Sequence, residues 1–199
     1  MLRVLLKLSR IIDAVNSRIG KVLSWLVIAA VLVSATNATV RKLFDLSSNA
    51  WLELQWVLFS IVFLLCAPWT LLSNEHIRID IVNNLFPQWL RNVIDVIGHV
   101  FFLLPLTIVM LITSLPFFLR SFAVREQSMN AGGLPQWPTK SLIFICFALL
   151  LLQCLSELIK RIAVMRGDIA DPYASGPHSA AEAEAERVIA VATSEPKPQ

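Results

Sequence analysis

The sequence is poor in the residues from which enzyme active sites and metal centres are built. Charged residues make up 16% of its 199 positions, and it contains three histidines and three cysteines. None of the patterns CxxC, GxxxxGK[ST], HExxH and GxSxG occurs, so the usual residues for a zinc site, ATP-driven transport, zinc proteolysis and esterase chemistry are missing. We therefore expect no enzymatic activity, and no metal ion or other cofactor in this chain.

The excess of basic residues does not indicate nucleic-acid binding. The formal net charge is +3, and most lysines and arginines stand next to apolar segments, where membrane orientation explains them. Cys66, Cys146 and Cys154 all fall within apolar segments, so a secreted disulfide framework is not expected either. No nucleic-acid partner is predicted.

Hydrophobic residues, in contrast, make up 56% of the sequence and are concentrated in four segments. These segments are each close to the roughly 20 residues that cross a bilayer as a helix: residues 22–40, 51–72, 93–119 and 142–159. The sequence predicts an all-α membrane protein with a four-helix transmembrane domain over residues 22–162. Residues 163–199 are rich in Pro, Ala and Glu, and we expect them to form a disordered tail.

Residues 1–21 have the pattern of an amphipathic helix. Apolar residues recur every three or four positions, with basic residues on the other side: Leu5, Leu8, Ile12, Val15 and Ile19 against Arg3, Lys7 and Arg10. We expect a basic helix lying in the membrane surface. The alternative is the charged region of a cleaved signal peptide, but the apolar stretch continues to Val40 and favours an uncleaved anchor.

Lysine and arginine are unevenly divided between the two sides of the predicted bundle. The side that holds the N-terminus, the second connection and the C-terminal segment carries about twice as many as the other side. Cytoplasmic loops are enriched in these residues. Both termini are therefore predicted to be cytoplasmic.

Small residues and prolines within the predicted spans indicate how the helices pack and bend. Ala30, Ser34 and Ala38 recur every four residues, the spacing that lets helix backbones approach closely. Bends are expected at the prolines of the second and third spans, because each removes a backbone donor and crowds the preceding turn: Pro68, Pro105 and Pro116.

Ionisable residues inside membrane spans are candidates for a functional role. Asp95 and His99 stand four residues apart in the third span, as do Gln153 and Glu157 in the fourth. Asp95 and Glu157 lie within about two turns of a span end, where charges are tolerated at modest cost. We favour structural pairing over a proton relay.

Two connecting loops carry motifs, and the second span opens with a short polar motif. The candidate structural or partner-interface residues are Glu53 and Trp56 at that opening, Glu75, His76, Arg78 and Asp80 in the second connection, and Glu126, Ser128, Gly132, Gly133, Pro135, Trp137, Pro138 and Lys140 in the third. The glycines permit positive backbone torsions, and the prolines beside Trp137 fix a turn. Each loop motif fits a structural turn and a docking site equally well.

Taken with the four spans, these motifs resemble the small membrane subunit, of the DctQ type, of tripartite ATP-independent periplasmic (TRAP) transporters, over about residues 18–166. The resemblance implies a non-catalytic scaffold in a bacterial or archaeal cytoplasmic (inner) membrane. It implies two partners: a large multi-span subunit that carries the substrate and sodium sites, and a periplasmic solute-binding protein. It further implies sodium-coupled uptake of organic acids, with carboxylates such as C4-dicarboxylates as the expected class.

Two other functions are compatible with the residues. A membrane-anchor subunit of a respiratory oxidoreductase is suggested by four helices and by His99 near Asp95, although one intramembrane histidine is too few for a bis-histidine haem within this chain. A small self-contained dimeric exporter is suggested by the four-span size.

Overall fold

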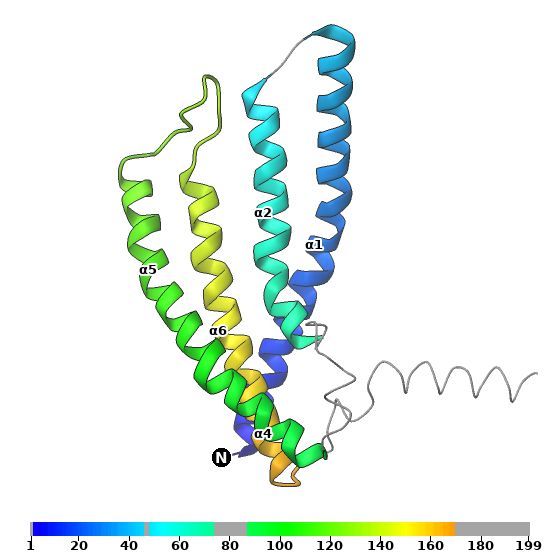
Figure 1. The fold of residues 1–199 in the computed structure, drawn as a ribbon, viewed down its shortest axis with the longest axis vertical. Coiled ribbons are helices and arrows are strands. Elements are labelled where there is room, and N and C mark those ends of the chain that lie inside the picture. Colours follow the sequence, from blue (N-terminus) through cyan, green and yellow to red (C-terminus); the bar gives the residue numbers. More distant parts are fainter. Residues whose placement is uncertain (1, 46–47, 74–86, 170–199) are drawn as a thin grey trace, which may run out of the picture.

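The computed structural model describes residues 2–45, 48–73 and 87–169 of the chain (Figure 1). Its helices are α1 (Leu2–Phe44), α2 (Asn49–Leu72), α4 (Gln88–Gly98), the π-helical turn η1 (His99–Leu103), α5 (Leu104–Ala123) and α6 (Trp137–Met165). Four stretches are long and apolar enough to cross a membrane: Val4–Phe44, Asn49–Leu72, Trp89–Ala123 and Trp137–Met165. The predicted all-α fold with four spans is confirmed.

The helices form two neighbouring pairs that meet at α6. Figure 1 shows α1 beside α2 and α5 beside α6, with α6 on the side of its pair that faces α2. Helix α6 packs against α1, α2, α4 and α5. We call the end that carries residues 124–136 the loop end, and the opposite end, where α4 lies near the start of α1, the α4 end. Helix α6 is therefore the element that joins the bundle from end to end.

Helix α1 is continuous through the predicted boundary between an interfacial helix and the first span. It has 43 residues, which at 1.5 Å per residue corresponds to about 65 Å. A separate interfacial helix over residues 1–21 is therefore not confirmed. The buried side of this half of α1 is polar, since Ser9 and Asn16 are 1% and 2% exposed, whereas Leu8 and Val15 of the expected apolar face lie on the outside.

Glycine and proline shape the helices at two contacts. Gly20 of α1 lies against the indole of Trp69, so closely that a Cβ atom at this position would overlap the ring. Pro105 follows the π-helical turn η1. Proline provides no amide hydrogen and its ring crowds the preceding turn, which explains why the regular α-helix is interrupted there. The π-helical turn is the local break that was predicted for the third span.

The last helix is longer than its predicted span. Helix α6 continues to Met165, and Gly167 follows it with a φ of +77°, the left-handed conformation with which helices commonly end. Most of the predicted tail, residues 170–199, lies outside the described part of the chain. The same holds for the second connection, including Glu75, His76, Arg78 and Asp80.

Candidate functional site

At the loop end, one acidic side chain of α2 holds the loop between α5 and α6. Glu53 is 6% exposed, and its carboxylate accepts hydrogen bonds from the hydroxyl of Ser128, the amide Nδ2 of Asn130 (2.8 Å) and the backbone N–H of Leu134 (2.6 Å). These donors come from residues 75 or more positions further along the chain. Glu53 thus ties the tip of one helical pair to the other pair.

The loop also closes on itself. The backbone amides of Ser128 and Gln136 donate to the carbonyls of Leu134 (3.1 Å) and Glu126 (2.9 Å), and Gln127 and Pro135 form an isolated antiparallel bridge. The hairpin is therefore braced by its own backbone as well as by Glu53.

Each glycine of the loop has a different role. Gly132 has a φ of +73°, a conformation that favours glycine, so the positive torsion that the sequence permits at both glycines occurs at this one. Gly133 is needed for space, because a Cβ atom there would overlap Ser128 and the Glu53 carboxylate. The Gly132-Gly133 pair thus brings the loop backbone close to the acid that binds it.

Aromatic and charged contacts fix the loop to the start of α6. Lys140 Nζ lies 2.5 Å from Glu126 Oε2 and 4.3 Å from the ring centroid of Phe117. The Trp137 indole packs edge-on against Phe122, with centroids 5.3 Å apart, and Pro138 lies in the first turn of α6. The hydrogen bond from Lys140 lowers the pKa of Glu126 below its usual value.

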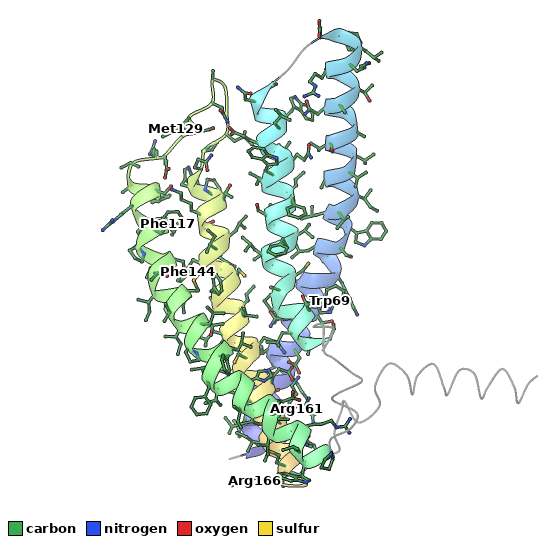
Figure 2. The ribbon with its side chains drawn as sticks, in the orientation of Figure 1. Trp69, Phe117, Met129, Phe144, Arg161 and Arg166 are labelled. Carbon is green, nitrogen blue, oxygen red and sulfur yellow. The ribbon has the colours of Figure 1, made fainter. Side chains whose placement is uncertain are left out.

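Most of the described candidate residues therefore belong to this loop end, with one exception. Trp56 lies further along α2, is exposed, and lines a groove between α1 and α2 with a volume of about 460 Å³. Ala30 and Ser34 of the small-residue stripe line the same groove. The tip residue Met129, labelled in Figure 2, is fully exposed. The loop thus presents an apolar side chain on a braced support.

A second polar cluster, which the sequence did not predict, lies towards the α4 end between α1 and α6. Gln153 is completely buried; its Nε2 donates to Asp13 Oδ1 and Glu157 Oε1, both at 2.9 Å. Its Oε1 accepts a hydrogen bond from Asn16 Nδ2 at 2.7 Å. Lys160 Nζ lies 2.5 Å from Glu157 and 3.1 Å from Asp13. We call these five residues the α1–α6 polar cluster.

Two serines extend this cluster by a further turn. The Ser9 and Ser156 hydroxyls lie 2.7 Å apart, and Ser156 also donates to Asp13 at 2.8 Å. The positions of Ser9, Asp13 and Asn16, at helical spacing on one side of α1, were a signal for this contact. The prediction for this segment rested on its apolar and basic positions, so this polar contact with α6 was not predicted.

Helix α4 is bound to α6 by a buried ion pair. Arg161 of α6 donates to Asp95 Oδ2 at 2.6 Å and to Asn92 Oδ1 at 2.9 Å. The Nδ1 of His99 lies 2.6 Å from the Asp95 backbone carbonyl rather than from its carboxylate. The expectation of structural pairing for Asp95 is confirmed, and Figure 2 shows Arg161 at this crowded end of the bundle.

The described residues thus form two polar anchors separated by apolar helices. Among residues 2–45, 48–73 and 87–169, no group of three or more His, Cys, Asp or Glu side chains could hold a metal ion. The buried charged side chains all have partners: Arg161 pairs with Asp95 across the α4–α6 interface, Glu157 pairs with Lys160 within α6, and Glu53 is bound by neutral donors of the loop. This arrangement defines a helical membrane protein whose polar groups fix the positions of its helices.

The comparison with protein families shows the family to which the chain belongs. Residues 30–164 match the DctQ component of tripartite ATP-independent periplasmic transporters. The chain belongs to this family, and it is a TRAP transporter small membrane subunit. Comparisons with curated proteins and with solved structures give no match. The match covers the loop end and the α6 part of both polar anchors, but Ser9, Asp13 and Asn16 precede it.

Proposed function

We propose that this chain is the fixed scaffold subunit of a sodium-coupled, binding-protein-dependent importer of organic acids. The family match over residues 30–164 carries the proposal. In this proposal, a large multi-span subunit carries the substrate and the sodium ions. The small subunit binds no substrate or cofactor, catalyses no reaction and supports the large subunit in the cytoplasmic membrane.

The two polar anchors support a fixed role for the chain. At the loop end, Glu53 binds three donors from the α5–α6 loop. At the α4 end, Gln153 and Arg161 join α6 to α1 and α4. A bundle whose helices are joined at both ends resists relative helix movement, because movement would leave buried polar groups without partners. A carrier that moves substrate across the bilayer needs such an immobile support.

The braced loop is the proposed contact with the periplasmic solute-binding protein. The distribution of lysine and arginine favours a periplasmic position for the loop end, with both termini in the cytoplasm. Met129 at the tip is exposed on a loop that Glu53 and Gly132 hold in one shape. A rigid loop loses little conformational entropy when a partner binds, and a flexible apolar methionine adapts to the partner surface.

The first test concerns assembly and uptake. The tagged chain is purified from native membranes in mild detergent, and co-purifying proteins are identified by mass spectrometry. The proposal expects a large polytopic subunit in a one-to-one complex, and loss of organic-acid uptake when this chain is deleted. Recovery of redox subunits with a haem spectrum would favour the respiratory anchor. Transport by this chain alone in liposomes would favour the exporter.

The second test concerns the loop. Glu53→Gln places an amide, which is itself a donor, among the three loop groups that donate to Glu53, and it should therefore loosen the loop. Binding of the solute-binding protein should weaken about tenfold, while the large subunit still co-purifies. Asp45→Asn is the matched control, because it makes the same charge change at the same end on an exposed side chain. Equal effects of both variants would contradict a specific role for the Glu53-braced loop.

A further inference from the structure

The first half of α1 has three distinct sides. At about 100° per residue, Lys7, Arg10, Arg18 and Lys21 fall within an arc of about 80°, and all four side chains are exposed. We call these four residues the basic stripe. The side that carries Ser9 and Asn16 is buried against α6, so the basic stripe is held facing outward.

Within the described part of the chain, no ion pair is found that involves a residue of the basic stripe. The ion pairs found in this part join Lys140 to Glu126, Lys160 to Asp13 and Glu157, and Arg161 to Asp95. Asp13, the acidic residue of this segment, is directed to α6. Four positive charges therefore remain available for a ligand outside the bundle.

The charges of α6 and their contacts with α1 place the basic stripe across the edge of the hydrocarbon layer. Lys140 and Lys160 are 20 residues apart in sequence, which corresponds to about 30 Å along a helix and to the thickness of a bilayer core. With Lys160 at one edge, Asp13 lies at the same level, because Lys160 Nζ is 3.1 Å from Asp13 Oδ2. Lys7 and Arg10 then lie about 5–9 Å beyond this edge, and Arg18 and Lys21 lie about 8–12 Å inside it, from where their long side chains extend towards the headgroups.

A third, apolar side of the same segment is also exposed. Leu8, Ile11 and Val15 lie on the outside of the bundle, on a different side of α1 from the basic residues. A helix with one apolar side and one basic side fits the boundary of a bilayer, where acyl chains lie next to phosphate groups. Both exposed sides are explained together when the occupant is lipid.

We propose that the basic stripe is a binding site for anionic phospholipid headgroups, with the adjacent apolar side in contact with their acyl chains. Lysine and arginine near a membrane surface attract anionic lipids, and one arginine side chain can bind two oxygens of the same phosphate at once. The α1–α6 polar cluster fixes the rotation of α1 and so directs the stripe to the headgroups. This site does not depend on the transport role, because it is formed by this chain alone.

The test uses native mass spectrometry of the full purified chain in non-ionic detergent with phosphatidylglycerol or phosphatidylcholine. We expect phosphatidylglycerol to bind at least tenfold more tightly, with a preference that decreases as salt is raised. In the variant Lys7→Gln, Arg10→Gln, Arg18→Gln, Lys21→Gln, the preference should fall to threefold or less. The matched control removes four exposed basic residues at the loop end: Arg41→Gln, Lys42→Gln, Arg120→Gln, Arg125→Gln.

Three outcomes would overturn the proposal. The first is equal binding of the two lipids by the native chain. The second is an equal loss of preference in the control variant, which would show that net charge rather than the stripe is responsible. The third is a stripe variant that keeps its lipid preference but loses the co-purifying large subunit, which would assign the stripe to a protein partner. Far-ultraviolet circular dichroism of both variants checks that the exposed substitutions leave the helices intact.

Discussion

Gln153→Leu is the sharpest test of the α1–α6 polar cluster. Leucine has a similar size, so the substitution mainly removes hydrogen bonds. Gln153 makes three of them, to Asp13, Glu157 and Asn16. The variant leaves Asn16 with a buried amide that has lost its acceptor.

The expected magnitude follows from these three bonds. Side-chain hydrogen bonds between membrane helices are worth about 0.6 kcal/mol on average and up to about 1.7 kcal/mol. Three such bonds correspond to a loss of about 2 to 5 kcal/mol in the free energy of unfolding. The complete burial of Gln153 favours the upper half of this range, because water cannot replace the lost partner of Asn16.

Reversible unfolding in mixed detergent micelles, followed by circular dichroism, measures this loss. Gln55→Leu is the matched control: it makes the same change in α2, where Gln55 lines the groove beside α1. The double variant Asn16→Leu, Gln153→Leu should be less destabilised than the sum of the single variants, because both partners are then apolar. A loss below about 0.5 kcal/mol for Gln153→Leu, or a strictly additive double variant, would refute the reasoning.

Three further substitutions or conditions test other contacts. Gly20→Ala should destabilise the bundle by about 1–3 kcal/mol in thermal unfolding, because the new methyl group overlaps the packed indole, whereas Gly98→Ala has open space and should not destabilise it. Arg161→Ala should cost about 3–5 kcal/mol by removing the guanidinium that pairs with the Asp95 carboxylate, and adding Asp95→Asn should recover part of this loss in the same assay. Glu126 has a lowered pKa, so its ion pair stabilises the loop at neutral pH and is lost as the pH falls through that lowered value. The protection factors of the loop amides, that is, their exchange rates corrected for the slower intrinsic exchange in acid, should therefore fall as the pH is lowered, and a Glu126→Gln variant should lack this acid-induced loss.

The four spans could be predicted from the sequence because the physical requirement for crossing a bilayer is local. A helix needs about 20 apolar residues in succession, and each stretch shows this without knowledge of its neighbours. The turn at Gly132 was predictable for the same reason, since its positive φ is a property of one residue and its backbone. The actual helices exceed the predicted spans where polar residues continue the helix, as at the end of α6.

The polar contacts could not be predicted because each requires two distant segments. Glu53 is separated by 75 residues from Ser128, and Asn16 by 137 residues from Gln153. The sequence indicated that Glu53 and Ser128 carried a motif, but hydropathy alone gave no way to join them. The polar side of α1 was readable as a helical stripe, yet only the packing against α6 shows that it is buried.

The two anchors make α6 the mechanical centre of the subunit. Lys140 binds the loop at one end of this helix and Arg161 binds α4 at the other; their separation of 21 residues corresponds to about 31 Å. Between Lys140 and the α1–α6 polar cluster, residues 141–152 are mainly apolar, and for such a segment packing alone specifies rotation and register weakly. Buried polar pairs at both ends supply that specification, because a rotation or a slip of one residue would separate donors from acceptors. A helix held in this way at each end, with α1 and α2 packed against it, keeps a constant shape across the bilayer, which is what the proposed scaffold role requires of it.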